Sequence, residues 1–391
     1  MNPLQARIPK TVWVLGLVSM FMDVSSEIIH ALLPLFMTAT LGLSVAMVGL
    51  VDGIAEATAS ITKVFSGYVS DRIGRRKPLI LLGYGLGAAS KPLFALATGA
   101  LPILSARFAD RVGKGIRGAP RDAMVAEVTP PELRGRAFGL RQSLDTVGAF
   151  AGPLIAVGLM FVLANDMRLI FWIAVVPGMI AFALVLWGLK ERRIRPAEAV
   201  PPIRFHDLRE LDRKFWSVVL IGVFLSMGRI SEAFLILRAT SLGLSFALAP
   251  LVLVVMNLIY SAGAYPAGIL SDRVSSRNLL LTGIVALVAS HLILGFANGL
   301  PGVFAGISLW GVHMAMSQGI LARMVADTTK PFLRGSGFGL FSLCTGVALL
   351  GGSVVGGGLW DAIGPQATFF SAGAFAASSA LLIIGMGRTE P

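Results

Sequence analysis

The stretch GYVSDRIGRRK at residues 67–77 is a short basic turn between two apolar segments. A related stretch, GILSDRVSSR at residues 268–277, begins 201 positions later and also lies between apolar segments. Lys and Arg in short loops stay on the cytoplasmic side of a membrane, so such a turn also orients the chain. One basic turn in each half therefore predicts an internally duplicated protein that crosses a bilayer several times.

The composition also indicates a membrane protein. Hydrophobic residues make up 55% of the 391 residues and charged residues 14%, and the mean hydropathy is +0.79. A soluble domain carries about 25% charged residues. Because roughly 20 apolar residues span the hydrocarbon core, the chain is long enough for about twelve spans. The net charge of +12 follows from cations placed in loops, so we reject nucleic-acid binding. The single cysteine, Cys344, excludes an intrachain disulfide.

Apolar runs predict six spans on each side of one long polar stretch. That stretch, 190–213, is rich in Arg and Pro and predicts a linker between a first bundle at 1–189 and a second at 214–391. The first apolar run contains Asp23 and Glu27, so we expect a retained span and not a cleaved signal peptide. The predicted spans lie at about 11–39, 45–68, 78–98, 101–125, 134–161, 168–189, 214–240, 246–268, 277–297, 301–325, 334–360 and 365–387.

The loops alternate sharply in charge. One set carries nearly all of the loop Lys and Arg residues, whereas the opposite set has one cation, Arg168. By the positive-inside rule, we expect both termini and the linker to be cytoplasmic.

An internal repeat links the two halves. Residues 124–140 and residues 324–340 are identical at eleven of seventeen positions. Because each half is predicted to have an even number of spans and to begin inside, the repeats are parallel and related by an axis along the membrane normal. Two such halves can expose a site between them to each side of the membrane in turn. A duplicated receptor or scaffold that does not transport is the alternative.

These features resemble the major facilitator superfamily over essentially the whole chain. Residues 67–77 match its loop signature Gly-x-x-x-Asp-Arg-x-Gly-Arg-Arg, and the second copy departs from it at Ser275 and Ser276. The element formed by Gly148, Gly152 and Pro153 resembles the signature of its proton-coupled antiporters. The resemblance implies an all-α integral membrane protein, with twelve transmembrane helices in two pseudo-symmetric six-helix bundles. It also implies secondary transport by alternating access.

The loop signature is expected to form a cytoplasmic gate. By resemblance, Asp71 would face the start of the eleventh span near Arg334, where a carboxylate meets the positive end of a helix dipole. By internal symmetry, Asp272 would face Arg134 at the start of the fifth span. Glycine permits the close helix approach and the tight turn. The predicted gate residues are Gly67, Asp71, Arg72, Gly74, Arg75, Arg76, Arg134, Asp272, Arg273 and Arg334.

Ionisable residues at membrane depth form helical stripes. Such residues are costly in lipid and usually face a cavity or a partner. Acidic stripes on the first two spans and a basic stripe on the fourth predict a cavity with walls of opposite charge, whose carboxylates are suited to carry protons. Asp23 is our first choice for the proton site, followed by Glu27, Asp52 and Glu56. The predicted cavity residues are His30, Arg107, Asp110, Arg111, Lys114, Arg141, Asp145, Arg229 and Glu232.

The leading hypothesis is a proton-coupled antiporter that exports a small solute and needs no cofactor. We expect it to be a monomeric multi-pass protein of a bacterial inner membrane, whose partners are the solute, protons and lipid. The Arg and Lys residues of the fourth span also support a carrier of anionic or phosphorylated metabolites. Transition-metal or metal-chelate transport is a further alternative, because His30 lies beside carboxylates and methionines, but we expect no metal site. No phosphate loop, nucleophile elbow or metalloprotease spacing indicates an enzyme.

Overall fold

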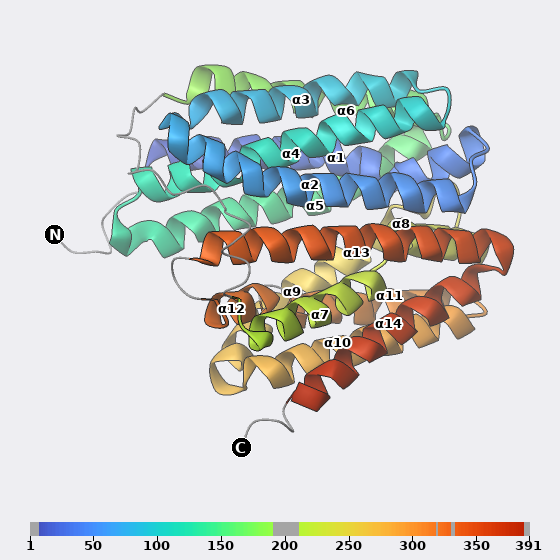
Figure 1. The fold of residues 1–391 in the computed structure, drawn as a ribbon. Helices are drawn as coiled ribbons and strands as arrows, with labels where there is room; N and C mark the ends of the chain where they lie inside the picture. The colour runs from blue at the N-terminus through green and yellow to red at the C-terminus, as the bar shows by residue number, and fades with distance from the viewer. Residues whose placement is uncertain (1–7, 191–210, 318–319, 330–332, 387–391) are drawn as a thin grey trace. The chain divides into compact units, whose positions relative to one another are not determined.

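The computed structural model describes residues 8–190, 211–317, 320–329 and 333–386 (Figure 1). Helices joined by short turns make up nearly all of this part of the chain. Most of the predicted linker, 190–213, lies outside the described residues. The helices are α1 Lys10–Leu35, α2 Val45–Ile73, α3 Lys77–Leu96, α4 Ala100–Val128, α5 Arg134–Val162, α6 Met167–Gly188, α7 Arg213–Gly228, α8 Ala233–Ser241, α9 Leu251–Arg273, α10 Ser276–Phe296, α11 Leu300–Ser317, α12 Ile320–Asp327, α13 Arg334–Ala362 and α14 Pro365–Met386.

Eleven segments of the described chain are long and apolar enough to cross a membrane. The predicted fourth span forms the 29-residue helix α4 but is absent from this set, because charged side chains interrupt its apolar runs. The predicted seventh span consists of two helices, α7 and α8, separated at residues 229–232. The all-α membrane fold is therefore confirmed, whereas the count of twelve spans stays a prediction.

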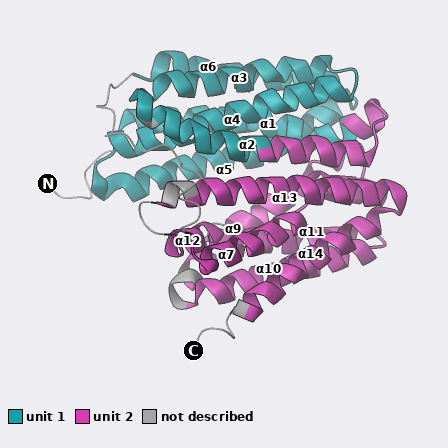
Figure 2. Ribbon diagram, in the orientation of Figure 1, with its two compact units in different colours: residues 1–36, 58–201 teal, residues 37–57, 202–391 magenta. Residues whose placement is uncertain are grey.

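The chain divides into two compact units, drawn in different colours in Figure 2. Unit 1 contains residues 1–36 and 58–201, and unit 2 contains residues 37–57 and 202–391. The start of α2 thus belongs to the unit that contains the second half of the chain. The proposed domain limits of 1–189 and 214–391 stay a prediction.

In unit 1, α1 packs against α5 and α6, and α3 packs against α4 and α6. Small residues allow the closest approaches. A Cβ built on Gly83 of α3 would lie 2.6 Å from the carbonyl oxygen of Gly113 of α4, and the reverse contact is equally short. Val12, Leu15, Tyr84 and other fully buried side chains fill the space between these helices. Such close helix contact is typical of membrane bundles, where packing and not water expulsion holds helices together.

In unit 2, α10 packs against α11 and α14, and α7 packs against α13 and α14. The first turns of α2 lie against α13, where Gly49 leaves no room for a side chain beside the carbonyl of Ser353. The carboxylate of Asp361 on α13 accepts hydrogen bonds from the backbone amides of Val45 at 3.1 Å and Ala46 at 2.8 Å. Asp361 therefore caps the amino end of α2, where the helix dipole also favours a negative charge.

Candidate functional site

The two carboxylates of α1, Asp23 and Glu27, lie against the antiporter-like element of α5, which is formed by Gly148, Gly152 and Pro153. A Cβ built on Gly148 would lie 3.0 Å from the Cβ of Asp23, and one built on Gly152 would lie 2.6 Å from the Cβ of Glu27. Both glycines are buried, as is Pro153 beside them. The absence of side chains at these two positions therefore lets α5 close over the acidic stripe of α1.

Asp23 is half-buried and makes no hydrogen bond or ion pair to any residue that the structure describes. The charged groups that act on its carboxylate from neighbouring helices are Asp145 of α5 and Lys114, Arg117 and Arg121 of α4. Cations and a second carboxylate thus influence Asp23 together without fixing it in an ion pair. A carboxylate in this setting can change its protonation without first breaking a hydrogen bond.

Asp145 belongs to a network of paired charges. Its Oδ2 accepts a hydrogen bond from Arg141 at 2.9 Å and lies 4.0 Å from Arg121. Arg141 is also 3.6 Å from Asp122. The other oxygen of Asp145, Oδ1, is buried without a hydrogen-bond partner in the described structure. The predicted pair of Arg141 and Asp145 is therefore present, and the second oxygen of the Asp145 carboxylate remains able to accept a hydrogen bond.

Polar contacts fix the basic stripe of α4 against α1 and α3. Arg121 donates a hydrogen bond to Ser19, whose hydroxyl is 3.0 Å from that of Tyr84. The guanidinium of Arg117 lies over the Tyr84 ring at 4.6 Å from its centroid. This geometry is a cation–π contact. Arg117 and Arg121 therefore face the interior of unit 1.

Glu27 lies one turn beyond Asp23 and has a different environment. Its Oε2 is 3.3 Å from Nδ1 of His30, and Lys114 and Arg111 of α4 also act on it. Glu27 is therefore surrounded by potential cations, whereas Asp23 also faces a second carboxylate. The two carboxylates predicted to couple protons are thus not equivalent.

A buried ion pair that the sequence analysis missed lies beside this stripe. Nζ of Lys91 on α3 donates to Oδ1 of Asp110 at 2.6 Å and to the hydroxyl of Ser26 at 2.9 Å. Lys91 is 1% exposed and Asp110 is 3% exposed, so solvent does not screen the pair. Arg111 lies 4.0 Å from the second oxygen of Asp110, and Arg107 also acts on this carboxylate.

The acidic residues of α2 meet residues of the seventh predicted span. Asp52 accepts a 2.6 Å hydrogen bond from Ser231, and Glu56 and Glu232 both act on Arg229. All of these residues belong to unit 2. Asp52 therefore contacts the break between α7 and α8, and Glu56 acts on the same break. The acidic wall predicted for Asp23, Asp52 and Glu56 stays a prediction.

The loop signature is only partly within the described structure. Arg76 donates to Glu127 of α4 at 3.1 and 2.9 Å and to Ser70 at 2.6 Å. Gly74 has a φ of 63°, a left-handed conformation that favours glycine. Arg72, Arg75 and Arg134 are exposed, and Gly67 is half-buried. The side chains of Asp71, Asp272, Arg273 and Arg334 lie outside the described residues, so the gate between them stays a prediction.

Among the described residues, no group of three or more His, Cys, Asp or Glu side chains could hold a metal ion.

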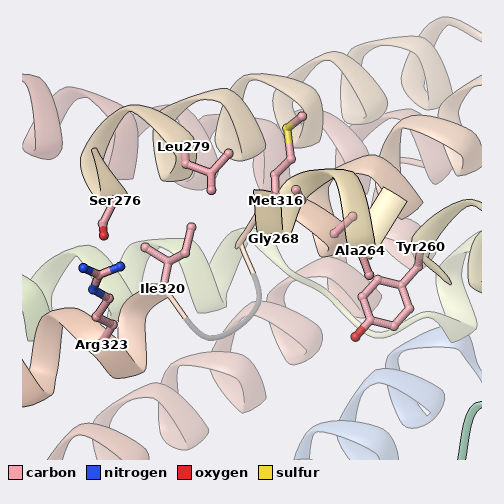
Figure 3. A pocket seen from close by; sticks show the side chains of 10 residues that line it. Tyr260, Ala264, Gly268, Ser276, Leu279, Met316, Ile320 and Arg323 are labelled. Carbon is pink, nitrogen blue, oxygen red and sulfur yellow. The ribbon is translucent and has the colours of Figure 1, made fainter. Parts of the chain in front are cut away.

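A cavity of about 330 Å³ lies in unit 2 between α9, α10, α11 and α12 (Figure 3). Apolar side chains line most of it, with Tyr260 near one end and Ser276 and Arg323 near the other (Figure 3). None of the predicted site residues lines this cavity.

Known proteins share both the sequence pattern and the fold. The Major Facilitator Superfamily model matches residues 15–237 and 218–391. An uncharacterised MFS-type transporter of Methanocaldococcus jannaschii is 31% identical, and the match covers 98% of this chain and 96% of the relative. The multidrug resistance protein MdtH of Aeromonas hydrophila is 25% identical over 97% of this chain and 96% of its own. A crystal structure of a POT family transporter bound to a thioalcohol-conjugated peptide has a TM-score of 0.80 at 12% identity, and covers 98% and 97% of the two chains.

Proposed function

Because this chain belongs to the major facilitator superfamily and is a multi-pass secondary transporter, we propose that it exports a small solute in exchange for protons. The class of substrate, a small exported solute, is suggested by its MdtH relatives, which are named multidrug resistance proteins. We also propose that it works as a monomer in a bacterial inner membrane, with both termini in the cytoplasm.

The environment of Asp23 carries this proposal. Its carboxylate has no direct partner in the described structure, and the Asp145 carboxylate and three α4 cations act on it. When Asp23 is protonated, the three cations face only the negative charge of Asp145. When Asp23 releases the proton, its carboxylate offsets one more of their positive charges. The protonation of this one residue thus changes the charge of the site that a solute meets.

The close contact between α1 and α5 supports exchange over leakage. Because Gly148 and Gly152 bring α5 onto the backbone of α1, water has little room to enter from that side of Asp23. The proton path that we propose runs along the face of α1 that meets α4. Tight packing of this kind allows exchange to be coupled, since an open water path would dissipate the proton gradient.

Everted membrane vesicles test the proposal. The vesicles are acidified inside, and a pH-sensitive dye reports proton efflux when candidate solutes are added. We expect solute-dependent proton efflux from vesicles with the wild-type protein and none with Asp23→Asn. Asp327→Asn removes the same charge from an exposed side chain (68% exposed) and is the matched control. Solute transport that does not depend on the pH gradient, together with full activity of Asp23→Asn, would refute proton exchange.

A carrier of anionic metabolites is the second candidate function. Lys91, Arg107 and Arg111 all act on the carboxylate of Asp110, so three cations gather in one part of unit 1. An anionic solute bound there would favour protonation of nearby carboxylates, so solute and proton would move together. The direction of proton movement in the vesicle assay therefore separates the two candidates.

A further inference from the structure

The cavity in unit 2 has polar side chains at its two ends and an apolar middle (Figure 3). Ser276 and Arg323 lie near one end, and Tyr260 lies near the other (Figure 3). Its volume of about 330 Å³ falls within the range of roughly 300–1,000 Å³ that is typical of small-molecule sites. The apolar side chains that line it are Ala264, Ala267, Leu279, Ala315, Met316 and Ile320. The cavity therefore has the size and the lining of a site for a small organic molecule.

The corresponding place in the first repeat holds larger or hydrogen-bonded side chains. Ser66 of α2, 201 positions before Ala267, donates to the carbonyl of Gly115 on α4 at 2.8 Å. The stem of Lys63, 201 positions before Ala264, reaches α4, where it lies 3.8 Å from a Cβ built on one of the glycines of that helix. Two alanines of the second repeat thus replace side chains that connect α2 with α4 in the first.

An ion pair of the first repeat is also missing at the polar end of the cavity. Arg76 binds Glu127 of α4 at 3.1 and 2.9 Å. At the offset of 200 positions stand Ser276 and Asp327, which cannot form an ion pair with each other. The second repeat therefore has small side chains where the first has a lysine, a serine and an arginine. Because the first repeat fills this place, the cavity is not a necessary consequence of the fold.

The end of the cavity at Ser276 and Arg323 is suited to an anion. The guanidinium of Arg323 lies 3.9 Å from the carboxylate of Asp327, which is beyond hydrogen-bond distance, and the two side chains are 63% and 68% exposed. An ion pair of this kind contributes little, so Arg323 can turn its donors toward a ligand. Ser276 adds a hydroxyl group and is the first residue of α10, where the helix dipole also favours a negative charge.

We propose that this cavity binds a small amphipathic organic anion. The carboxylate of the ligand meets Arg323 and Ser276, and its apolar or aromatic body lies beside Met316, whose flexible thioether side chain adapts to different shapes. The site is separate from Asp23 and from the α4 cations that act on it, because those residues belong to unit 1. The proposal goes beyond the proposed function, since it requires neither protons nor transport.

Equilibrium binding of 4-phenylbutyrate to the purified protein in discs of zwitterionic lipid tests the proposal. The neutral 4-phenylbutyramide is the matched probe, and empty discs correct for partition into lipid. We expect wild type to bind the acid at least about threefold more tightly than the amide, as for one exposed charged contact. Arg323→Gln should remove this preference. Ala264→Leu should fill the cavity and weaken the binding of both probes by at least about tenfold. Arg213→Gln, at the exposed first turn of α7, removes a cation outside the cavity and should bind both probes as wild type does.

Protection of a cysteine gives a second readout that does not require the cavity to be filled. Cys344→Ser removes the one cysteine of the chain, and Met316→Cys in that background places a thiol in the cavity. At a 4-phenylbutyrate concentration of about twice its Kd, labelling of Met316→Cys by a maleimide should slow about threefold. Labelling of Arg213→Cys, outside the cavity, should not change.

Three results would overturn the proposal: equal affinity of wild type for acid and amide, unchanged binding by Ala264→Leu, or no protection of Met316→Cys. Loss of probe binding in discs that contain phosphatidylglycerol would assign the cavity to a lipid, and the small solute would again be the wrong occupant. Because these experiments use no pH gradient, their failure leaves the test of proton exchange unaffected.

Discussion

Substitution of Gly152 by alanine probes the contact on which the candidate site depends. An added Cβ would lie 2.6 Å from the Cβ of Glu27, 3.0 Å from the carbonyl oxygen of Val24 and 3.3 Å from the amide of Ile28. None of these atoms is the end of a flexible side chain. The methyl group can therefore be accommodated only if α1 and α5 move apart or bend.

The expected change in the free energy of unfolding follows from two opposing effects. Overpacking of a tight contact costs about 1–3 kcal/mol, whereas replacing glycine by alanine inside a helix gains about 0.5–1 kcal/mol. We therefore expect Gly152→Ala to destabilise the protein by about 1–2 kcal/mol. Gly158→Ala, on the same helix with no atom within 4 Å of the added Cβ, should be neutral or slightly stabilising.

Reversible unfolding in mixed detergent micelles measures the stability of both variants, and the vesicle assay measures their solute-driven proton movement. We expect Gly152→Ala to lose solute-driven proton movement as well as stability, because separation of α1 from α5 displaces both carboxylates of α1. Gly158→Ala should behave as wild type in both assays. If Gly152→Ala were as stable and as active as Gly158→Ala, the contact between α5 and the acidic stripe would not be functional.

Substitutions at three further contacts test the structure outside the α1–α5 interface. Asp361→Ala removes the cap of α2 and should cost about 1 kcal/mol, with faster hydrogen exchange in the first turn of α2; unchanged exchange would contradict this. Arg76→Gln and Glu127→Gln should each lower the free energy of unfolding by about 1 kcal/mol, and the double variant should lose no more than either single variant. The exposed Arg75→Gln should lower it by less than about 0.5 kcal/mol. Arg238→Ala should cost about 2–3 kcal/mol by thermal unfolding, because its buried guanidinium bonds the last carbonyls of α10; a neutral result would refute that role.

Hydropathy and the positions of cations were enough to predict most of the helices. The predicted span 45–68 corresponds to α2 at Val45–Ile73, and 168–189 corresponds to α6 at Met167–Gly188. The element at Gly148 and Gly152 was also recognisable, because glycines four positions apart lie on one helix face. Its partners on α1 were not, since sequence periodicity gives the face of a helix but not the helix that it meets.

Lys91 shows why single charges are missed. It is the one charged residue of the predicted span 78–98 and forms no stripe, so the periodicity of that span carried no signal. Its pairing depends on α3 and α4 lying together, which only coordinates give. The comparison of Lys91 with His291, at the repeat offset of 200 positions, could have drawn attention to it.

The partners of Asp52 could not be predicted from the sequence for a different reason. Its spacing from Glu56 placed both on one face of α2, but the α4 cations and Arg229 were equally good electrostatic partners. The break between α7 and α8 supplies one partner that periodicity does not indicate. Ser231 lies outside the regular helix there, and its hydroxyl both donates to Asp52 and accepts from the amide of Ala233.

Proton release on solute binding tests the role of Asp23 most directly. Purified protein in unbuffered detergent solution is mixed with a solute that passed the vesicle assay, and the pH change is recorded for wild type and for Asp23→Asn. We expect wild type to release protons into the solution and Asp23→Asn to release none while still binding the solute. Equal proton release from the two proteins would show that solute and proton do not meet at Asp23.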